Sequence, residues 1–181
     1  MKGLKEWATV VKALENGRQT VILRKGGILD VPSGFNIESE KFLLFPTYEH
    51  QNKENLKEQD EKYLEMVEDY KQNNDFNNVT SYAEVLYQKD VQDGDQIKKL
   101  TDFHIWSDSY IDTRRNWKPE KPIKAIFLKT FKIPPTLIPI KPEYHGCKSW
   151  IEINANVPEG EPVLNDAELD SRLKKFKEVV A

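Results

Sequence analysis

The feature of this sequence that most constrains its fold is a run of apolar and β-branched residues from Ile123 to Ile133 (IKAIFLKTFKI). Residues of these types favour strands. The run is too uniformly apolar for either face of such a strand to lie against water, so both faces need to be covered. The sequence therefore predicts a sheet in which residues 123–133 form a central strand.

Shorter strands are predicted around this one from their β-branched and aromatic content. They cover residues 19–25, 42–45, 82–88, 103–106 and 149–153. Four prolines follow the central strand and predict extended chain there, or at most an edge strand, because proline has no N–H to donate to a neighbour. These are Pro134, Pro135, Pro139 and Pro142.

Apolar residues at helical spacing predict helices over about residues 3–16, 53–72 and 96–100, and a fourth near the C-terminal end. The apolar face of the long charged helix consists of Leu56, Tyr63, Leu64, Val67 and Tyr70. An asparagine-rich loop at 72–78 is expected to end it, since asparagine favours turns. Before the last helix, Asn165 and Glu168 have the spacing of a capping box.

Helices and strands do not alternate regularly, which predicts an α+β fold in one domain over residues 1–181. We expect a mixed, mostly antiparallel sheet that could curl into a small barrel, with three to four flanking helices. Charged residues make up 31% of the chain and the mean hydropathy is -0.69. No apolar run is long enough for a membrane span, and the first residues lack the apolar stretch of a signal peptide, so we expect a cytoplasmic protein.

Cysteine content limits the chemistry further. The chain has a single cysteine, which excludes an internal disulfide and a zinc site built mainly from thiolates. Neither a metal nor a cofactor is predicted.

Charge is distributed unevenly along the chain. Between Arg114 and Lys148 there are nine basic and two acidic residues, whereas residues 49–113 are strongly acidic. Clustered cations are typical of proteins that bind a polyanion, because they displace counterions from phosphate groups. Alternatively, the acidic and basic blocks face each other within the fold.

The first candidate site is the segment LRKGGI at 23–28. Arg24 and Lys25 leave a strand just before Gly26 and Gly27, and such a turn can bring backbone N–H groups close to an anion. The alternative is an ordinary hairpin turn with two solvated cations.

A second candidate is FPTYEHQ at 45–51, where an apolar strand ends in polar residues. His50 beside a carboxylate could serve as a general base, since histidine is the side chain most often used for proton transfer near neutral pH. Tyr48 and Gln51 are candidate binding residues. Alternatively, Thr47 caps the helix that follows.

Aromatic residues and cations alternate between His104 and Trp117, as on surfaces that stack bases and bind phosphate. The candidate residues are Trp106, Arg114, Arg115 and Trp117. In a small domain such aromatics can equally belong to the core.

The last candidate is YHGCKSW at 144–150, which contributes His145, Lys148 and Trp150 as binding residues. Cys147 beside His145 raises the alternatives of a thiol nucleophile or a metal ligand, but the spacing is diagnostic of neither.

Taken together, Glu6-Trp7-Ala8, LRKGGI, FPTYEHQ and YHGCKSW resemble a bacterial family catalogued as domain-of-unknown-function family 1802. The resemblance runs from about residue 4 to residue 153. The residues that match its motifs are Trp7, Arg24, Lys25, Gly26, Gly27, Phe45, Pro46, Thr47, His50, Gln51, Gly146, Cys147 and Trp150. Members occur beside restriction-endonuclease-like domains, which implies a role near DNA modification or defence.

The opening of the chain is similar, more weakly, to PUA-like barrels of the ASCH type. A helix is followed by Gly17-Arg18-Gln19-Thr20 and a strand that ends in Arg24, although Gln19 and Leu23 stand where that pattern has lysine and glutamate. This resemblance implies a PUA-like barrel that binds RNA or modified nucleobases.

These observations favour a nucleic-acid-binding module, such as a modified-base reader, with DNA or RNA as partner and no membrane. The basic block with interleaved aromatics carries this interpretation. The alternative is a phosphodiesterase or nuclease-like hydrolase acting on a phosphate-bearing substrate, with His50 as base and Arg24 and Lys25 holding the anion. The sequence leaves the oligomeric state open.

Overall fold

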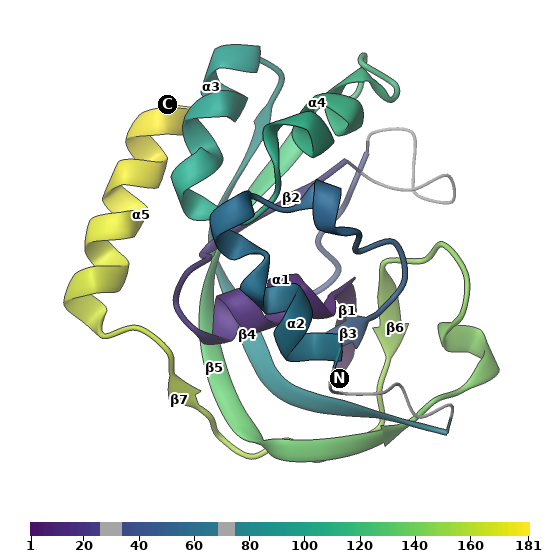
Figure 1. Ribbon diagram of the computed structural model, residues 1–181. Helices are drawn as coiled ribbons and strands as arrows, with labels where there is room; N and C mark the ends of the chain where they lie inside the picture. The colour runs from purple at the N-terminus through teal and green to yellow at the C-terminus, as the bar shows by residue number, and fades with distance from the viewer. Residues whose placement is uncertain (26–33, 69–74) are drawn as a thin grey trace.

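The computed structural model describes residues 1–25, 34–68 and 75–181, and within them one sheet is the centre of the fold (Figure 1). Its seven strands are β1 (Lys2–Trp7), β2 (Val21–Arg24), β3 (Lys41–Thr47), β4 (Phe76–Val91), β5 (Ile123–Pro139), β6 (Trp150–Glu152) and β7 (Glu161–Pro162). They are ordered β2-β5-β4-β3-β1-β6, with β7 beside β5, and only β1 and β3 pair in parallel. The predicted α+β fold with a mostly antiparallel sheet is confirmed.

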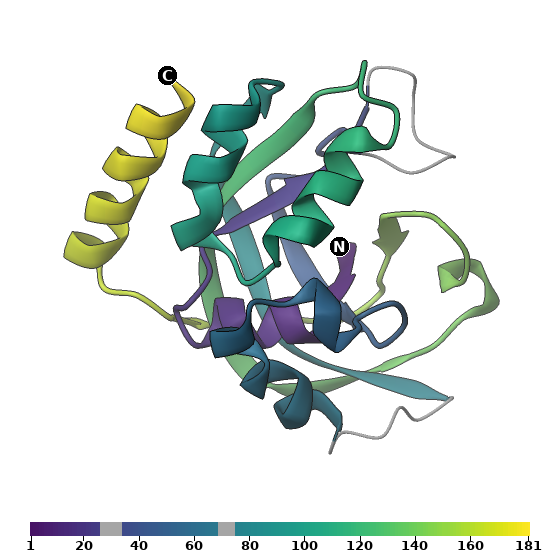
Figure 2. The same cartoon turned by 45° about the horizontal axis from the view of Figure 1, so that its top comes forward.

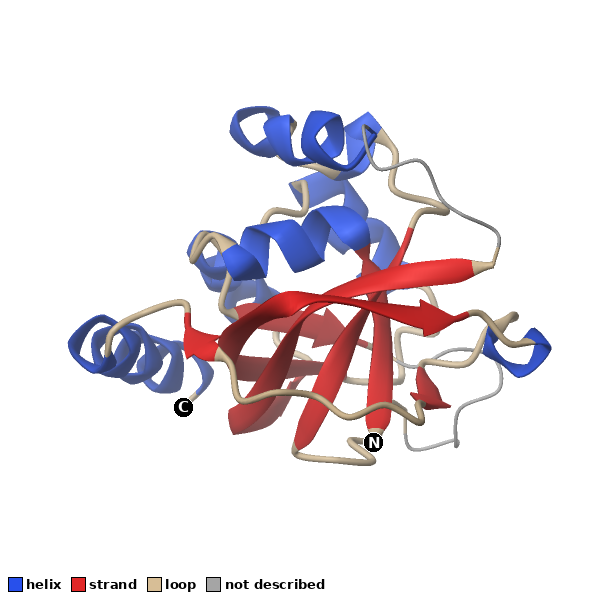
Figure 3. Cartoon of the chain, turned by 90° about the horizontal axis from the view of Figure 1, so that it is seen from below, coloured by secondary structure: helices blue, strands red, loops and turns tan. Residues whose placement is uncertain are grey.

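Five α-helices flank the sheet within the described residues, where three to four were predicted. They are α1 (Ala8–Glu15), α2 (Lys62–Glu68), α3 (Gly94–Lys99), α4 (Asp108–Asn116) and α5 (Asp166–Val180). Most of the helices lie on one face of the sheet, with α5 at one end (Figure 3). In Figure 2, α5, α3 and α4 follow one another from left to right. No helix in this part of the chain is both long and apolar enough to cross a bilayer.

The apolar run at 123–133 does form a strand between two neighbours, because β5 pairs with β2 on one side and with β4 on the other. β5 is longer than predicted and continues to Pro139. Pro134 and Pro135 are accommodated where the β4–β5 register shifts between Val79 and Ser81, since such an irregularity needs no donor from the proline.

The sheet curls without closing into a barrel. Within the described residues no ladder joins β2 to β1 or β6 at the far end of the strand order. The curvature nevertheless brings β2 close to β1. A hydrogen bond from Arg24 Nη1 to the backbone oxygen of Lys5, at 3.1 Å, spans the two strands. The gap between these strands positions the site described below.

Two helix predictions are wrong in part. Residues 2–7 form β1, because β3 and β6 on either side supply the backbone partners that override a local helical pattern, and the helix begins only at Ala8. The long helix at 53–72 is instead two 3-10 turns, η1 (Lys53–Asn55) and η2 (Glu58–Asp60), followed by α2. Between those turns, Leu56 bridges to Trp106 and holds the chain extended. Tyr70 lies outside the described residues.

The strand predicted at 103–106 is also wrong: a 3-10 turn, η3 (Leu100–Phe103), precedes the single bridge at Trp106. Asn77 and Asn78, expected in a loop, belong to β4 because β5 supplies their partners. The last helix is confirmed. Its Asn165 side chain accepts from the Glu168 N–H, as in a capping box, while the Glu168 carboxylate pairs with Arg172 rather than returning to the cap.

Candidate functional site

Four of the motifs found in the sequence meet at one cavity of about 390 Å³ beside the gap between β1 and β2. We call it the β1–β2 pocket. Its lining comes from five segments, namely β1 (Lys5, Glu6, Trp7), the end of β2 (Leu23, Arg24, Lys25), the end of β3 and beyond (Thr47, Glu49, His50), Trp106 with α4 (Tyr110, Arg114), and residues 146–149 (Gly146, Cys147, Lys148, Ser149).

An ion pair joins the two strands that border the pocket. Arg24 Nη1 lies 3.1 Å from Glu6 Oε2, and Glu6 Oε1 accepts from the backbone N–H of Trp7 at 2.9 Å. Only 5% of the Glu6 side chain is exposed, so the pair is largely shielded from water. The Arg24 guanidinium also lies over the Phe35 ring, 5.0 Å from its centroid. These contacts fix both charged groups in place.

Aromatic rings form one wall of the pocket. The centroids of Trp7 and Tyr110 lie 5.0 Å apart at an angle of 50°, while Tyr110 and Trp106 are stacked at 6.4 Å and 28°. Trp106, predicted to stack on a ligand, is only 4% exposed and belongs to the core, so Trp7 and Tyr110 provide the accessible part of this wall. Burial raises the pKa of the Tyr110 hydroxyl; the nearby Glu6 also raises it, whereas Arg114 and Arg24 lower it. The hydroxyl therefore stays protonated throughout the neutral range and can donate a hydrogen bond to a ligand.

The lining carries five basic side chains and two carboxylates, so its charge favours an anion. Lys5 Nζ donates to the backbone oxygens of Tyr144 and Gly146, at 2.8 and 2.9 Å, and thereby ties residues 144–146 to β1. Burial lowers the pKa of Lys5, and the neighbouring cations Lys148 and Arg24 lower it further, against the opposite effect of Glu49 and Cys147. Lys148 itself is exposed.

His50 lies at the open rim of the pocket with 86% of its side chain exposed. Its backbone φ is 65°, an uncommon value for a residue with a Cβ, and Asn55 Nδ2 donates to its backbone oxygen. The alternative that Thr47 caps the next helix is wrong: it ends β3, and Asn52 precedes the 3-10 turn. His50 thus shares the cavity with Arg24, as the hydrolase hypothesis requires.

Two predicted binding residues serve the fold through their polar atoms. Lys25 lines the pocket, but its Nζ donates to the backbone oxygens of Arg114 and Arg115 at 3.1 and 2.7 Å and so caps the end of α4. Burial lowers its pKa. Gln51 is buried, and its Oε1 accepts from the N–H of Thr9 in the first turn of α1. These bonds of both groups are therefore made to the backbone of neighbouring helices rather than directed at a ligand.

Trp150 is a core residue rather than a stacking surface. It is 9% exposed, packs against Phe35 and Phe42, and donates from Nε1 to the Asn36 backbone oxygen. Four further candidates lie outside the pocket lining, namely Tyr48, Arg115, Trp117 and His145. Gly26 and Gly27 lie outside the described residues.

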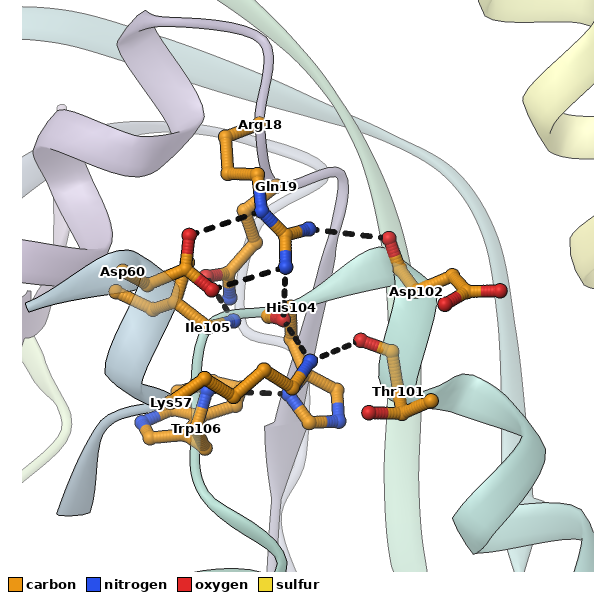
Figure 4. A network of polar contacts seen from close by, with 9 residues as sticks. All are labelled: Arg18, Gln19, Lys57, Asp60, Thr101, Asp102, His104, Ile105 and Trp106. Atoms are coloured by element: carbon orange, nitrogen blue, oxygen red, sulfur yellow. Dashed lines mark hydrogen bonds and ion pairs between the residues drawn. The ribbon is translucent and has the colours of Figure 1, made fainter. Parts of the chain in front are cut away.

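A buried polar network behind the pocket holds Trp106 in place (Figure 4). The backbone N–H of Trp106 donates to His104 Nδ1 at 3.2 Å, and the His104 backbone oxygen accepts from Lys57 and Arg18. Asp60 binds Arg18 through both carboxylate oxygens at 3.0 Å. Burial, together with the cations Lys57 and Arg18, holds the pKa of His104 well below its usual range, so the ring is neutral and can accept this bond.

The predicted site lacked several residues that line the pocket, among them Lys5, Glu6, Trp7 and Tyr110. Glu6 could have been found from the sequence, because Glu6-Trp7-Ala8 is one of the motifs that resemble the family. The helix predicted over residues 3–16 gave no reason to place its side chain beside Arg24. Tyr110 lies within the predicted aromatic segment, and only the formation of α4 turns it toward Trp7. Among the described residues no group of three or more His, Cys, Asp or Glu side chains could hold a metal ion.

Comparison with a family model agrees with the first resemblance predicted from the sequence. A family model described as domain of unknown function (DUF1802) matches residues 3–175. Among solved structures, ASCH from Zymomonas mobilis is similar, with 13% identity, 97% of this chain and 94% of that chain covered, and a TM-score of 0.41. A point mutant of that protein is also similar, with 13% identity, 97% of this chain and 96% of that chain covered, and a TM-score of 0.44. No curated protein matches. Both TM-scores lie below 0.5.

Proposed function

The chain belongs to the DUF1802 family of domains of unknown function, and we propose from its pocket that it is a nucleic-acid-binding module that takes one unpaired base into the β1–β2 pocket. The observation that carries this proposal is the convergence of an aromatic wall and a cationic lining in one cavity. Bases stack on aromatic rings whatever their sequence, while lysine and arginine bind the phosphates that flank them.

The dimensions of the pocket favour a single nucleotide unit over a duplex. A volume of about 390 Å³ lies within the range of roughly 300–1,000 Å³ that is typical of small-ligand pockets. A double helix would need an exposed groove-reading element, whereas an unpaired or extruded base can enter a pocket and stack between side chains. Arg114 and Lys148 lie in the lining, where they could contact the adjoining phosphates.

Titration with single-stranded DNA and RNA at two salt concentrations tests the proposal, with tryptophan fluorescence as the signal because Trp7 and Trp106 line the pocket. We expect binding that weakens with salt. Replacing Lys148 by alanine should weaken binding to every strand and reduce the slope of log K against log salt by about 0.7. The matched control is Lys174→Ala on α5, at the left of Figure 1, away from residues 142–149 on the right.

Two outcomes of this titration would contradict the proposal. Binding no tighter than about millimolar at low salt, or independent of salt, would contradict the proposal, because phosphate contacts release counterions. An equal effect of Lys174→Ala and Lys148→Ala would also contradict it, since the charge of the whole chain and not the pocket would then govern affinity.

One observation favours a second candidate function, a hydrolase acting on a phosphate-bearing substrate. His50 and Arg24 come from different motifs but line the same cavity. If the protein cleaves a single strand, His50→Ala should lower turnover by about 10²- to 10⁴-fold, the usual contribution of a general base, and leave binding nearly intact. Cleavage that survives the substitution, or no cleavage by the unaltered protein, would remove this candidate.

A further inference from the structure

The Glu6 carboxylate is a charged group that the lining of the β1–β2 pocket holds with only 5% of its side chain exposed. Oε1 accepts from the Trp7 N–H and Oε2 from Arg24 Nη1. A carboxylate oxygen can accept two hydrogen bonds, so the contacts in the described part of the chain leave one accepting position on each oxygen. Glu6 can therefore receive two neighbouring N–H groups from a ligand.

Arg24 supplies donors beside these acceptors. Its Nη1 is used by Glu6 and by the Lys5 backbone oxygen, and the guanidinium carries three further N–H bonds on Nη2 and Nε. An arginine beside a carboxylate presents a donor next to a pair of acceptors. The ligand that matches this arrangement has one acceptor followed by two donors along one edge.

Among the common bases, only guanine has that order. Its Watson–Crick edge offers the O6 acceptor, then N1–H, then the N2 amino group. Uracil and thymine place a carbonyl oxygen on each side of one N–H, and these oxygens would face the carboxylate. Adenine and cytosine offer one amino group next to a ring nitrogen that is itself an acceptor. Each of these bases would place an acceptor against the buried Glu6 carboxylate, which is costly.

We propose that the β1–β2 pocket reads the Watson–Crick edge of an unpaired guanine, with Glu6 as the specificity-determining residue and Arg24 as the donor to O6. This inference rests on the proposed function, because it assumes that a base enters the pocket. The aromatic wall suits a purine, since Trp7 and Tyr110 provide the stacking surface beside Glu6.

A series of oligonucleotides tests the proposal with the full chain. Each is a short thymine strand with one central guanine, hypoxanthine, adenine, cytosine or thymine, and the dissociation constants are compared at one salt concentration. We expect guanine to bind about tenfold or more tighter than adenine, cytosine or thymine, as a well-placed two-bond contact to a base permits. Hypoxanthine lacks the N2 amino group and should be intermediate.

Two variants of carboxylate residues test whether Glu6 causes the preference for guanine. Glu6→Gln is isosteric but replaces one acceptor by a donor, so the preference for guanine should disappear. Glu49→Gln removes the same charge at the exposed rim of the pocket, where 85% of the Glu49 side chain is exposed. It should strengthen binding of all strands alike and keep their order.

The outcomes separate this inference from the proposed function. If all central bases bind equally, while binding still weakens with salt and with Lys148→Ala, the binding module stands and the reading of guanine is overturned. A guanine preference that Glu6→Gln leaves intact would overturn it too. If no strand binds, both proposals fail. The series on the unaltered protein is decisive even if Glu6→Gln does not fold.

Discussion

Arg24 Nη1 lies 3.1 Å from Glu6 Oε2, and this contact joins two strands, β2 and β1, that share no ladder in the described part of the chain. The sheet curls far enough to bring the strands together but not far enough for their backbones to pair. A side-chain ion pair therefore spans the gap that the β1–β2 pocket occupies. The same two residues stabilise the curvature and provide the charges inside the pocket.

Breaking this pair should destabilise the fold. Arg24→Ala leaves the nearly buried Glu6 carboxylate with one fewer donor, and we expect a loss of about 2–3 kcal/mol in the free energy of unfolding, measured by urea denaturation. In the double variant with Glu6→Ala, the loss should be smaller than the sum of the two single losses, because no uncompensated charge remains. Strict additivity would show that the two groups are not coupled.

Acid should destabilise the protein through His104. Burial and two cations depress the pKa of this histidine in the folded state, so the unfolded chain binds its proton first. The stability that neutral His104 contributes is present above its unfolded pKa of about 6.5 and is lost as pH falls toward the lower folded value. We expect a decrease of up to about 1.4 kcal/mol per pH unit from this one proton, measured by urea unfolding between pH 7 and pH 5.

A matched variant separates His104 from the carboxylates that also titrate in acid. His104→Asn keeps a side-chain acceptor that can reach the N–H two residues on, as the ring does at Trp106, but it does not titrate. Its stability should decrease less steeply with falling pH over the same range. Identical slopes for the two proteins would mean that His104 is protonated in the fold without penalty.

Cys147 provides a probe of the pocket that needs no substitution. It is the only cysteine of the chain, it is exposed, and it lines the β1–β2 pocket. A bound oligonucleotide should slow its alkylation by iodoacetamide, by about tenfold at a concentration ten times the dissociation constant, when most of the protein is occupied. Mass spectrometry measures the rate. The unfolded protein is the control, and an unchanged rate in the folded protein at saturation would place the ligand elsewhere.

Lys5 should control the order of the segment that follows β5. Its Nζ holds the backbone oxygens of Tyr144 and Gly146, so Lys5→Met should cost about 1–2 kcal/mol and speed amide hydrogen exchange within residues 142–149. Lys148→Met is the control, because in the described residues its ammonium makes no such bond to the backbone. If exchange there is equal in both variants, the Lys5 contacts do not restrain the segment.

Several elements could be predicted from local sequence because their side-chain pattern and their surroundings agree. The strand at 123–133 and the helix after Asn165 are of this kind. The apolar run of the strand indicates burial on both faces, and the asparagine before the helix provides its capping side chain. The end of β3 and the end of β2 were correctly recognised as sites where polar residues follow a strand. Their motifs do line one cavity, together with part of the aromatic segment.

The errors arose where distant partners override local preference. Residues 2–7 have helical spacing but form a strand, because β3 and β6 provide backbone partners on both sides. Residues 53–60 form two short 3-10 turns beside the bridge between Leu56 and Trp106, and the α-helix begins only at Lys62. Three predicted binding residues instead serve the fold. Lys25 donates to backbone oxygens at the end of α4, Gln51 accepts from the first turn of α1, and the Trp150 ring is buried in the core.

The sequence by itself determined the fold class, a buried strand at 123–133 with a neighbour on each side, the family resemblance and the motifs from which a site could be built. Only the tertiary structure decided which of their residues meet. The curl of the sheet brings β1 beside β2, and that contact makes Glu6 and Arg24 neighbours although they lie on different strands. The physical reason is that a local pattern records which face of a segment is buried, whereas the approach of two strands without a shared ladder depends on how the whole sheet is packed.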